Sequence, residues 1–199
     1  MARKRGRSRD EIRLMVLDAA EAIVAAEGQA GLSVRRIAAV TGCTVGMLYL
    51  VFRNLDDLIQ QINSRTLDAL LERLQANYPE NPQDDPEKAM KALACAFIAY
   101  ANAETPRWSM FFEHITAKGD VLPEWSQHKM TCMFRLMETA LRALTGDEIK
   151  IARASHALWA GVYGICTLRI RQRLNLPSMQ SPEEMAGMLI ENFLRGLRG

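Results

Sequence analysis

Few residues in this 199-residue chain have the spacing that metal binding or catalysis requires. His128 and Cys132 lie four positions apart, a spacing that would place an imidazole and a thiol on one face of a helix. Two ligands are too few for a stable metal site, and the only other histidines are His114 and His156. The sequence also lacks a glycine-rich phosphate loop, a nucleophile elbow and an HExxH motif. We therefore expect no metal, no cofactor and no enzymatic activity.

The distribution of charge indicates a polyanionic partner. Residues 1–13 contain six arginines or lysines against two carboxylates, whereas the net charge of the whole chain is only +2. Basic N-terminal arms commonly bind polyanions, often in the minor groove of DNA. A solvated tail that only improves solubility has the same composition, and the arm alone does not distinguish the two. We predict a basic disordered arm over residues 1–10, in which Arg3, Lys4 and Arg5 are candidate DNA contacts.

A glycine stands near the start of the short apolar stretch TVGMLYLVFRNLDDL, which covers residues 44–58. Glycine costs about 1 kcal/mol relative to alanine inside a helix, so Gly46 requires an explanation. Two short helices joined at Thr41-Gly42-Cys43 would form a helix-turn-helix, whose second helix presents its N-terminal residues to the major groove. A glycine there allows the backbone to approach phosphates and base edges closely. The alternative is a helical corner in which Gly46 relieves crowding.

The side chains of this second helix divide into two faces by their spacing. Leu48 and Phe52 would pack inward, whereas Tyr49 would point outward and reach a phosphate with its hydroxyl. Val45 and Met47 could contact thymine methyl groups, which would suit a half-site that contains A·T pairs. The candidate DNA-binding residues are Arg3, Lys4, Arg5, Ser33, Arg35, Thr44, Val45, Gly46, Met47, Tyr49 and Arg53.

The elements that must position these residues are all predicted to be helices. Apolar residues recur at helical spacing, capping residues and prolines mark the helix starts, and strand evidence is almost absent. The sequence therefore predicts an all-α fold of about nine helices. We expect a three-helix DNA-binding domain with the helix-turn-helix over residues 11–54, and a ligand-binding and dimerisation domain over residues 55–199. Because no apolar run reaches 18 residues and the N-terminus lacks a secretory signal, we expect a cytoplasmic protein with no membrane segment.

The segment from Val16 to Ile59 resembles the DNA-binding domain of TetR-type transcriptional regulators. The matching positions are Leu17 to Ala20, Gly28, Leu32 to Val34, Ile37, Ala38, Gly42, the Gly46-x-Leu48-Tyr49-x-x-Phe52 core and Leu58. The resemblance implies a homodimer whose two recognition helices bind successive major grooves of a palindromic operator. It also implies a helical C-terminal domain that dimerises and binds a small molecule.

Several positions depart from the family pattern. Thr44-Val45, Leu50-Val51 and Leu55 stand where the family often has polar or basic residues. Phosphate contacts dominate non-specific DNA affinity, so the nearby arginines and the N-terminal arm would have to compensate. The alternative function is a helical protein-interaction module that has lost specific DNA readout.

The C-terminal half is rich in aromatic residues and methionines, which are common in apolar ligand pockets. An ordinary core is the alternative for any single residue. Leu158 to Leu168 resembles the tryptophan-histidine-glycine signature of one C-terminal subtype, with Tyr163 in the position of the histidine. The candidate polar groups of the pocket are Tyr100, His114, His156 and Tyr163. The candidate pocket residues are Phe97, Tyr100, Trp108, Phe111, Phe112, Met133, Met137, Trp159 and Tyr163.

Small residues on one helix and an apolar stripe on the last helix predict a dimer interface, although packing within one subunit explains the same pattern. The candidate interface residues are Ala157, Gly161, Gly164, Met185, Met188, Leu189 and Phe193. We predict a ligand-responsive repressor that binds a palindromic operator as a homodimer and is released by a small apolar or aromatic effector. We expect the ligand to shift the long helix from Asn54 to about Asn77, which would change the separation of the two DNA-reading heads.

Overall fold

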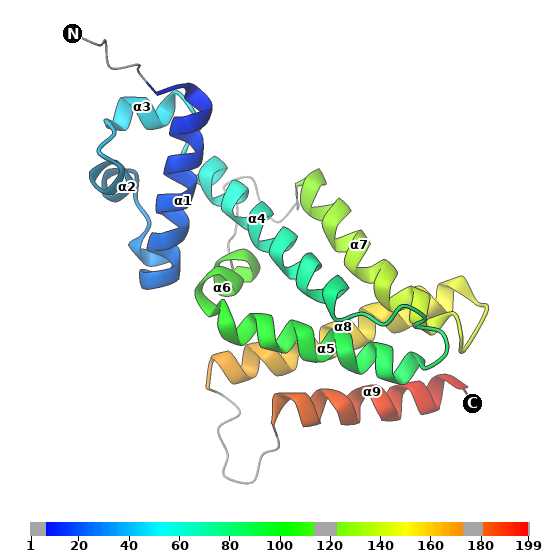
Figure 1. Cartoon of the computed structure of the whole chain (residues 1–199). Coiled ribbons are helices and arrows are strands. Elements are labelled where there is room, and N and C mark those ends of the chain that lie inside the picture. Colours follow the sequence, from blue (N-terminus) through cyan, green and yellow to red (C-terminus); the bar gives the residue numbers. More distant parts are fainter. Residues whose placement is uncertain (1–6, 114–122, 173–180, 199) are drawn as a thin grey trace. The chain divides into compact units, whose positions relative to one another are not determined.

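The computed structural model describes residues 7–113, 123–172 and 181–198. These residues form nine α-helices, a short 3₁₀ turn and no strand, which confirms the predicted all-α fold (Figure 1). The elements are α1 (Arg9–Glu27), η1 (Gln29–Gly31), α2 (Val34–Thr41), α3 (Val45–Tyr49), α4 (Leu55–Ala76), α5 (Pro86–Ala103), α6 (Thr105–Glu113), α7 (Glu124–Leu141), α8 (Glu148–Ile170) and α9 (Pro182–Arg198).

Hydrogen bonds between neighbouring residues fix where the helices begin. The N–H of Ser8 donates to Glu11 (2.6 Å) and the N–H of Glu11 donates to the Ser8 hydroxyl (3.2 Å), which forms a capping box. Because of this box, α1 begins at Arg9, inside the segment 1–10 for which the sequence predicts a disordered arm. Asn54 precedes α4 and accepts the N–H of Asp57 (2.7 Å), as the sequence predicts.

The described residues pack into two compact units. The first contains residues 7–67 and 106–113, and the second contains residues 68–105, 123–172 and 181–198. This division falls within α4 and assigns nearly all of α6 to the first unit, so it differs from the predicted limits of 11–54 and 55–199. The physical reason is the packing of Met110 on α6, which is buried in the core of the first unit.

The core of the first unit draws on five helices. Val16, Ile37, Leu48, Ile62 and Met110 come from α1, α2, α3, α4 and α6 respectively, and all of them are buried in one apolar cluster. Removal of this apolar surface from water is the main force that holds the short α2 and α3 in place, since helices of this length are not stable alone.

An ion-pair network joins three helices of the first unit. Arg65 on α4 pairs with Asp18 (2.9 Å) and Glu21 (3.2 Å) on α1, and Arg107 on α6 also pairs with Glu21 (2.9 Å). The hydrogen bond to Asp18 raises the pKa of Arg65 above its ordinary value. Because these side chains are only partly buried, we expect the network to orient the helices more than to stabilise them.

The second unit is a bundle in which α9 packs against α5 and α8, and α7 packs against the same two helices (Figure 1). Gly161 on α8 allows a close approach, because a Cβ at this position would lie 2.5 Å from Cδ2 of Leu189 on α9. Tyr78 holds the loop after α4 by donating its hydroxyl to the carbonyl oxygen of Leu136 on α7.

Candidate nucleic-acid interface and apolar cavity

Local hydrogen bonds form the turn between α2 and α3. Gly42 ends α2 with φ 68° and ψ 16°, a left-handed conformation that favours glycine. Thr41 Oγ1 donates to the carbonyl oxygen of Ile37 (2.8 Å) and accepts the N–H of Cys43 (3.4 Å). Thr44 then caps α3 by accepting the N–H of Met47 (3.2 Å). These contacts hold two short helices in the helix-turn-helix arrangement that the sequence predicts.

One side of α3 is buried and the other is exposed. Leu48 and the following Phe52 are each 4% exposed and pack into the core of the first unit. In contrast, Val45 is 40%, Tyr49 54% and Leu50 63% exposed. Three large apolar or aromatic side chains on so short a segment form an exposed surface of the kind that marks a binding site.

The surroundings of Met47 and Gly46 on α3 show how available each of these two candidate DNA-contact residues is to a partner. Met47 is half-buried because it packs against the core of the first unit, so it is less available for base contacts than Val45. Gly46 is exposed, and a Cβ there would meet only Thr44 Oγ1 at 3.9 Å. Crowding among the described residues therefore does not account for this glycine, whereas close approach of a partner would.

The segment of the sequence that contains α3 carries positive charge and no negative charge. Residues 28–55 contain Arg35, Arg36 and Arg53 and no carboxylate. Arg36 pairs with Glu27 (2.9 Å). Arg35 and Arg53 are exposed, and neither side chain forms an ion pair with another described residue. Two guanidinium groups are therefore available to bind an anionic partner.

The remaining candidates for DNA contact are the hydroxyl residues and the N-terminal arm. Ser33 and Thr44 are exposed, and each hydroxyl caps a helix by accepting one backbone N–H. A capping hydroxyl still has its own proton to donate to a phosphate oxygen. Arg3, Lys4 and Arg5 lie outside the described residues.

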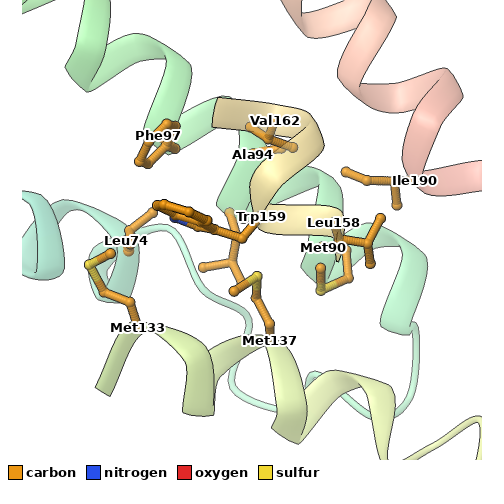
Figure 2. Close-up of a pocket in the computed structure, with 11 residues that line it drawn as sticks. Leu74, Met90, Ala94, Phe97, Met133, Met137, Leu158, Trp159, Val162 and Ile190 are labelled. Carbon is orange, nitrogen blue, oxygen red and sulfur yellow. The ribbon is translucent and has the colours of Figure 1, made fainter. Parts of the chain in front are cut away.

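A small apolar cavity lies within the second unit. Its volume is about 40 Å³, and no charged side chain lines it. Figure 2 shows the indole of Trp159 projecting from α8 into the space between Phe97 on α5 and Met133 and Met137 on α7, four residues that the sequence predicts for the pocket. The lining residues are Leu74, Met90, Leu93, Ala94, Phe97, Met133, Met137, Leu158, Trp159, Val162 and Ile190.

The aliphatic part of this lining is missed by the sequence interpretation, which selects aromatic residues and methionines. Leu74 comes from α4 and Ile190 from α9, so the lining extends over helices far apart in the chain. The sequence signal that could have identified these lining residues is apolar residues at helical spacing, such as Met90, Ala94 and Phe97. The same spacing is typical of every buried helix face, so it does not distinguish a cavity from a filled core.

The other predicted pocket residues lie apart from the cavity lining. Tyr100 is buried on α5, and the ring of Tyr163 stacks on Trp159 with centroids 5.3 Å apart. Trp108, Phe111 and Phe112 belong to α6 in the first unit, where the ring centroids of Trp108 and Phe112 are 4.8 Å apart.

The candidate polar groups that the structure describes, Tyr100, His156 and Tyr163, do not line the cavity either. His156 is exposed, its Nδ1 lies 2.6 Å from the carbonyl oxygen of Ala152, and its ring packs on Phe134 at 4.3 Å. His114 lies outside the described residues. The cavity is therefore suited to an uncharged apolar group.

The size of the cavity limits what it holds without rearrangement. A volume of 40 Å³ is close to the ~30 Å³ that one water occupies in the liquid. Pockets for drug-sized ligands are about 300–1,000 Å³. A larger ligand therefore requires the lining to move, and the flexible Met90, Met133 and Met137 are the side chains best able to do so.

The predicted dimer-interface residues have different environments. Met188 on α9 is 51% exposed and Ala157 on α8 is exposed, so both are available to a partner. Gly161 faces Leu189 of the same subunit, whereas a Cβ at Gly164 would meet nothing within 4 Å. The half-buried members of the set are Met185, Leu189 and Phe193.

His128 and Cys132, the two possible metal ligands at helical spacing, both lie on α7. Nε2 of His128 is 4.0 Å from Sγ of Cys132. In the described ranges, no three His, Cys, Asp or Glu side chains are grouped so that they could hold a metal ion. Within the same ranges, the helices all lack the length and apolar character needed to cross a membrane.

Comparison with known proteins matches most of the second unit to a family model. Residues 90–193, more than half of the chain, match the model described as "Tetracyclin repressor-like, C-terminal domain". A search of curated proteins found no match.

Solved structures resemble the chain over nearly its whole length. A protein of unknown function from Rhodococcus sp. RHA1 is 21% identical, with a TM-score of 0.73, 97% of this chain covered and 96% of that chain. A TetR-family transcriptional regulator from Streptomyces coelicolor is 15% identical, with a TM-score of 0.68 and coverages of 95% and 82%. A TetR-like transcriptional regulator from Rhodococcus sp. RHA1 is 18% identical, with a TM-score of 0.64 and coverages of 98% and 100%. At these identities, the likeness establishes the fold.

Proposed function

Since the chain belongs to the TetR family of transcriptional regulators, we propose that it is a ligand-responsive repressor that binds a palindromic operator as a homodimer. The observation that carries this proposal is the exposed side of α3, which lies in a segment with three arginines and no carboxylate. The DNA backbone is a dense array of negative charge, so a surface without carboxylates suits it.

In this proposal, α3 is the recognition helix and lies in the major groove. Val45, Gly46 and Tyr49 face the DNA, while Leu48 anchors the helix to the core. Arg35 and Arg53 bind phosphates, and the hydroxyls of Ser33 and Thr44 add neutral phosphate contacts. The basic arm with Arg3, Lys4 and Arg5 follows the backbone into the adjacent minor groove.

Dimerisation is proposed to use the outer surfaces of α8 and α9. Met188 supplies exposed apolar surface, and Ala157 and Gly164 allow a partner helix to approach closely. In a two-fold dimer the same surface meets itself, which gives a four-helix interface. The two recognition helices would then be about 34–36 Å apart, one turn of DNA.

The effector is proposed to be a small, uncharged, apolar or aromatic molecule. The absence of charged side chains from the cavity lining supports this chemistry, since an ion would lose its hydration without compensation. Trp159 lines the cavity and its ring stacks on Tyr163, so the indole offers a flat aromatic surface to a ligand. The tryptophan-histidine-glycine subtype stays a prediction.

The signal is proposed to pass along α4. This helix supplies Leu74 to the cavity lining and supplies Leu58 and Ile62 to the core of the first unit. A ligand that enlarges the cavity displaces the end of α4 and thereby changes the separation of the two recognition helices. Ligand releases DNA only if it binds more tightly to the conformation whose recognition helices do not fit the operator.

Selection of binding sites from a random DNA pool tests the proposal. The purified chain is incubated with the pool at about physiological salt, and bound DNA is sequenced. We expect one palindromic sequence to be enriched. Tyr49→Ala serves as the matched variant, which we expect to enrich this palindrome much less than the wild type does, while it remains folded and dimeric.

The exposed apolar side chains of α3 also favour a second candidate function, a protein-interaction module without specific DNA readout. This candidate predicts that no sequence is enriched. It also predicts a weak DNA affinity that depends on salt but not on sequence.

A further inference from the structure

We infer that α3 reads thymine methyl groups in the major groove, and that Val45 and Leu50 determine this specificity. The inference rests on the proposed function and names the chemistry that the recognition helix selects in its DNA partner. It differs from the sequence interpretation in one residue. Met47 is half-buried against the core, whereas Leu50 is the most exposed of the large apolar and aromatic side chains of this segment.

The first argument is the scarcity of hydrogen-bonding groups on the exposed side of α3. Among the residues from Thr44 to Leu50, only the Thr44 and Tyr49 hydroxyls can donate or accept through a side chain. Thr44 already accepts the N–H of Met47. The usual bidentate readout of guanine by arginine or of adenine by asparagine or glutamine is therefore absent from this segment.

The second argument is the apolar surface that remains. Val45 and Leu50 expose 40% and 63% of their surface, and that surface is stabilised only when a partner removes it from water. Among the four bases, only thymine presents an apolar group, its C5 methyl, to the major groove. An apolar reading surface in the major groove therefore selects thymine.

The third argument favours DNA over a protein as the partner of this surface. Arg35 and Arg53 are exposed within a carboxylate-free segment, which complements the negative charge of DNA phosphates. Gly46 lies between the apolar side chains with open space above it, so the backbone itself can approach a base edge. A protein partner would explain the apolar side chains but not the uniform sign of charge.

The experiment replaces thymine by uracil in the operator recovered by selection. This change removes one methyl group and leaves base pairing and every hydrogen-bonding group intact. At a contacted position we expect the affinity to fall about fourfold per methyl, and about 15-fold when both half-sites are changed, because burial of one methyl is worth ~0.8 kcal/mol. Affinities are measured by fluorescence anisotropy at fixed salt.

A double-mutant cycle between protein and DNA separates direct contact from changes in DNA shape. Val45→Ala and Leu50→Ala remove exposed side chains and should leave the fold intact, which thermal unfolding verifies. In each variant, we expect the penalty for uracil to shrink at the position that the missing side chain contacts. Ile149→Ala truncates an aliphatic side chain in the second unit that is as exposed as Leu50, and this variant should keep the full affinity penalty for uracil.

The outcomes distinguish failure of this inference from failure of the proposed function. If an operator is selected but uracil is tolerated at every position, thymine readout is wrong and sequence-specific binding stands. Thymine readout is equally wrong if uracil lowers the DNA affinity of all three variants, Val45→Ala, Leu50→Ala and Ile149→Ala, to the same extent. The loss of affinity then arises from DNA shape. If no sequence is selected, the proposed function fails, and thymine readout fails with it.

Discussion

Tyr49 is exposed directly after the buried Leu48, so its ring and hydroxyl are available to DNA while the helix stays anchored. We expect Tyr49→Ala to weaken operator binding at least tenfold, about 1.4 kcal/mol, without changing the dimer. Anisotropy with labelled operator measures the affinity, and sedimentation measures the mass. Tyr49→Phe separates the hydroxyl from the ring. An unchanged affinity for Tyr49→Ala would show that α3 is not the recognition helix.

Trp159 is the largest side chain of the cavity lining, and its removal should convert a small cavity into a ligand site. We expect Trp159→Ala to lower the free energy of unfolding by about 2–3 kcal/mol, less than for a fully buried tryptophan because this one is half-buried. Indole should then fill the space and raise the melting temperature of the variant. The wild type and Ile149→Ala should not respond. If indole leaves the melting temperature of Trp159→Ala unchanged, Trp159 does not fill a cavity as assigned here.

At the scale of elements, Tyr78 links the loop after α4 to α7 through its hydroxyl. Burial raises the pKa of Tyr78 from its ordinary value of 10.0 to about 12. Between these pH values the unfolded chain releases a proton that the folded chain keeps, so the unfolded state is favoured. The stability contributed by Tyr78 is therefore complete below pH 10 and is lost as the pH rises towards 12.

Denaturant unfolding between pH 9 and about pH 12 measures this effect. Other groups also titrate in this range, so the informative quantity is the difference between wild type and Tyr78→Phe. We expect the wild type to lose stability more steeply with rising pH. Parallel curves would mean that Tyr78 ionises equally easily in both states.

Salt dependence belongs to the scale of the whole dimer, because every phosphate contact is made twice. We expect Arg35→Ala and Arg53→Ala each to make the plot of log affinity against log salt shallower by about 1.8, which is about 0.9 per phosphate for two subunits. Arg142→Ala, which removes an ion pair with Glu148 in the second unit, is the matched control and should leave the slope unchanged. A slope that stays the same in all three variants would remove both arginines from the interface.

Met188 tests the dimer interface at the same scale. We expect Met188→Glu to shift the chain from dimer to monomer at micromolar concentration, because two carboxylates would face each other across the two-fold axis. Operator affinity should fall as well, since the two reading heads are no longer linked. Leu14→Glu, a similar change at an exposed apolar position of α1, should remain dimeric. If Met188→Glu stays dimeric, the interface lies elsewhere.

The sequence by itself determined the helices and the turn between α2 and α3. Ser33, Gly42 and Asn54 mark helix boundaries through hydrogen bonds or backbone angles that involve residues at most four positions away. Such interactions join residues that are neighbours in the chain, so they can be predicted from the local sequence. The burial of Leu48 and Phe52 opposite Tyr49 follows from the same local periodicity.

Only the tertiary structure decided which of these helices face one another. It placed Trp108 with the first unit, left Trp159 in the cavity, and added Leu74 and Ile190 to the lining. It also turned Met47 towards the core and left Leu50 exposed. Apolar residues at helical spacing indicate that a face is buried, but the partner of that face depends on packing between helices that lie up to about a hundred residues apart. Hydrophobic burial is non-directional, and for that reason the sequence predicts the elements of this protein but not its cavity.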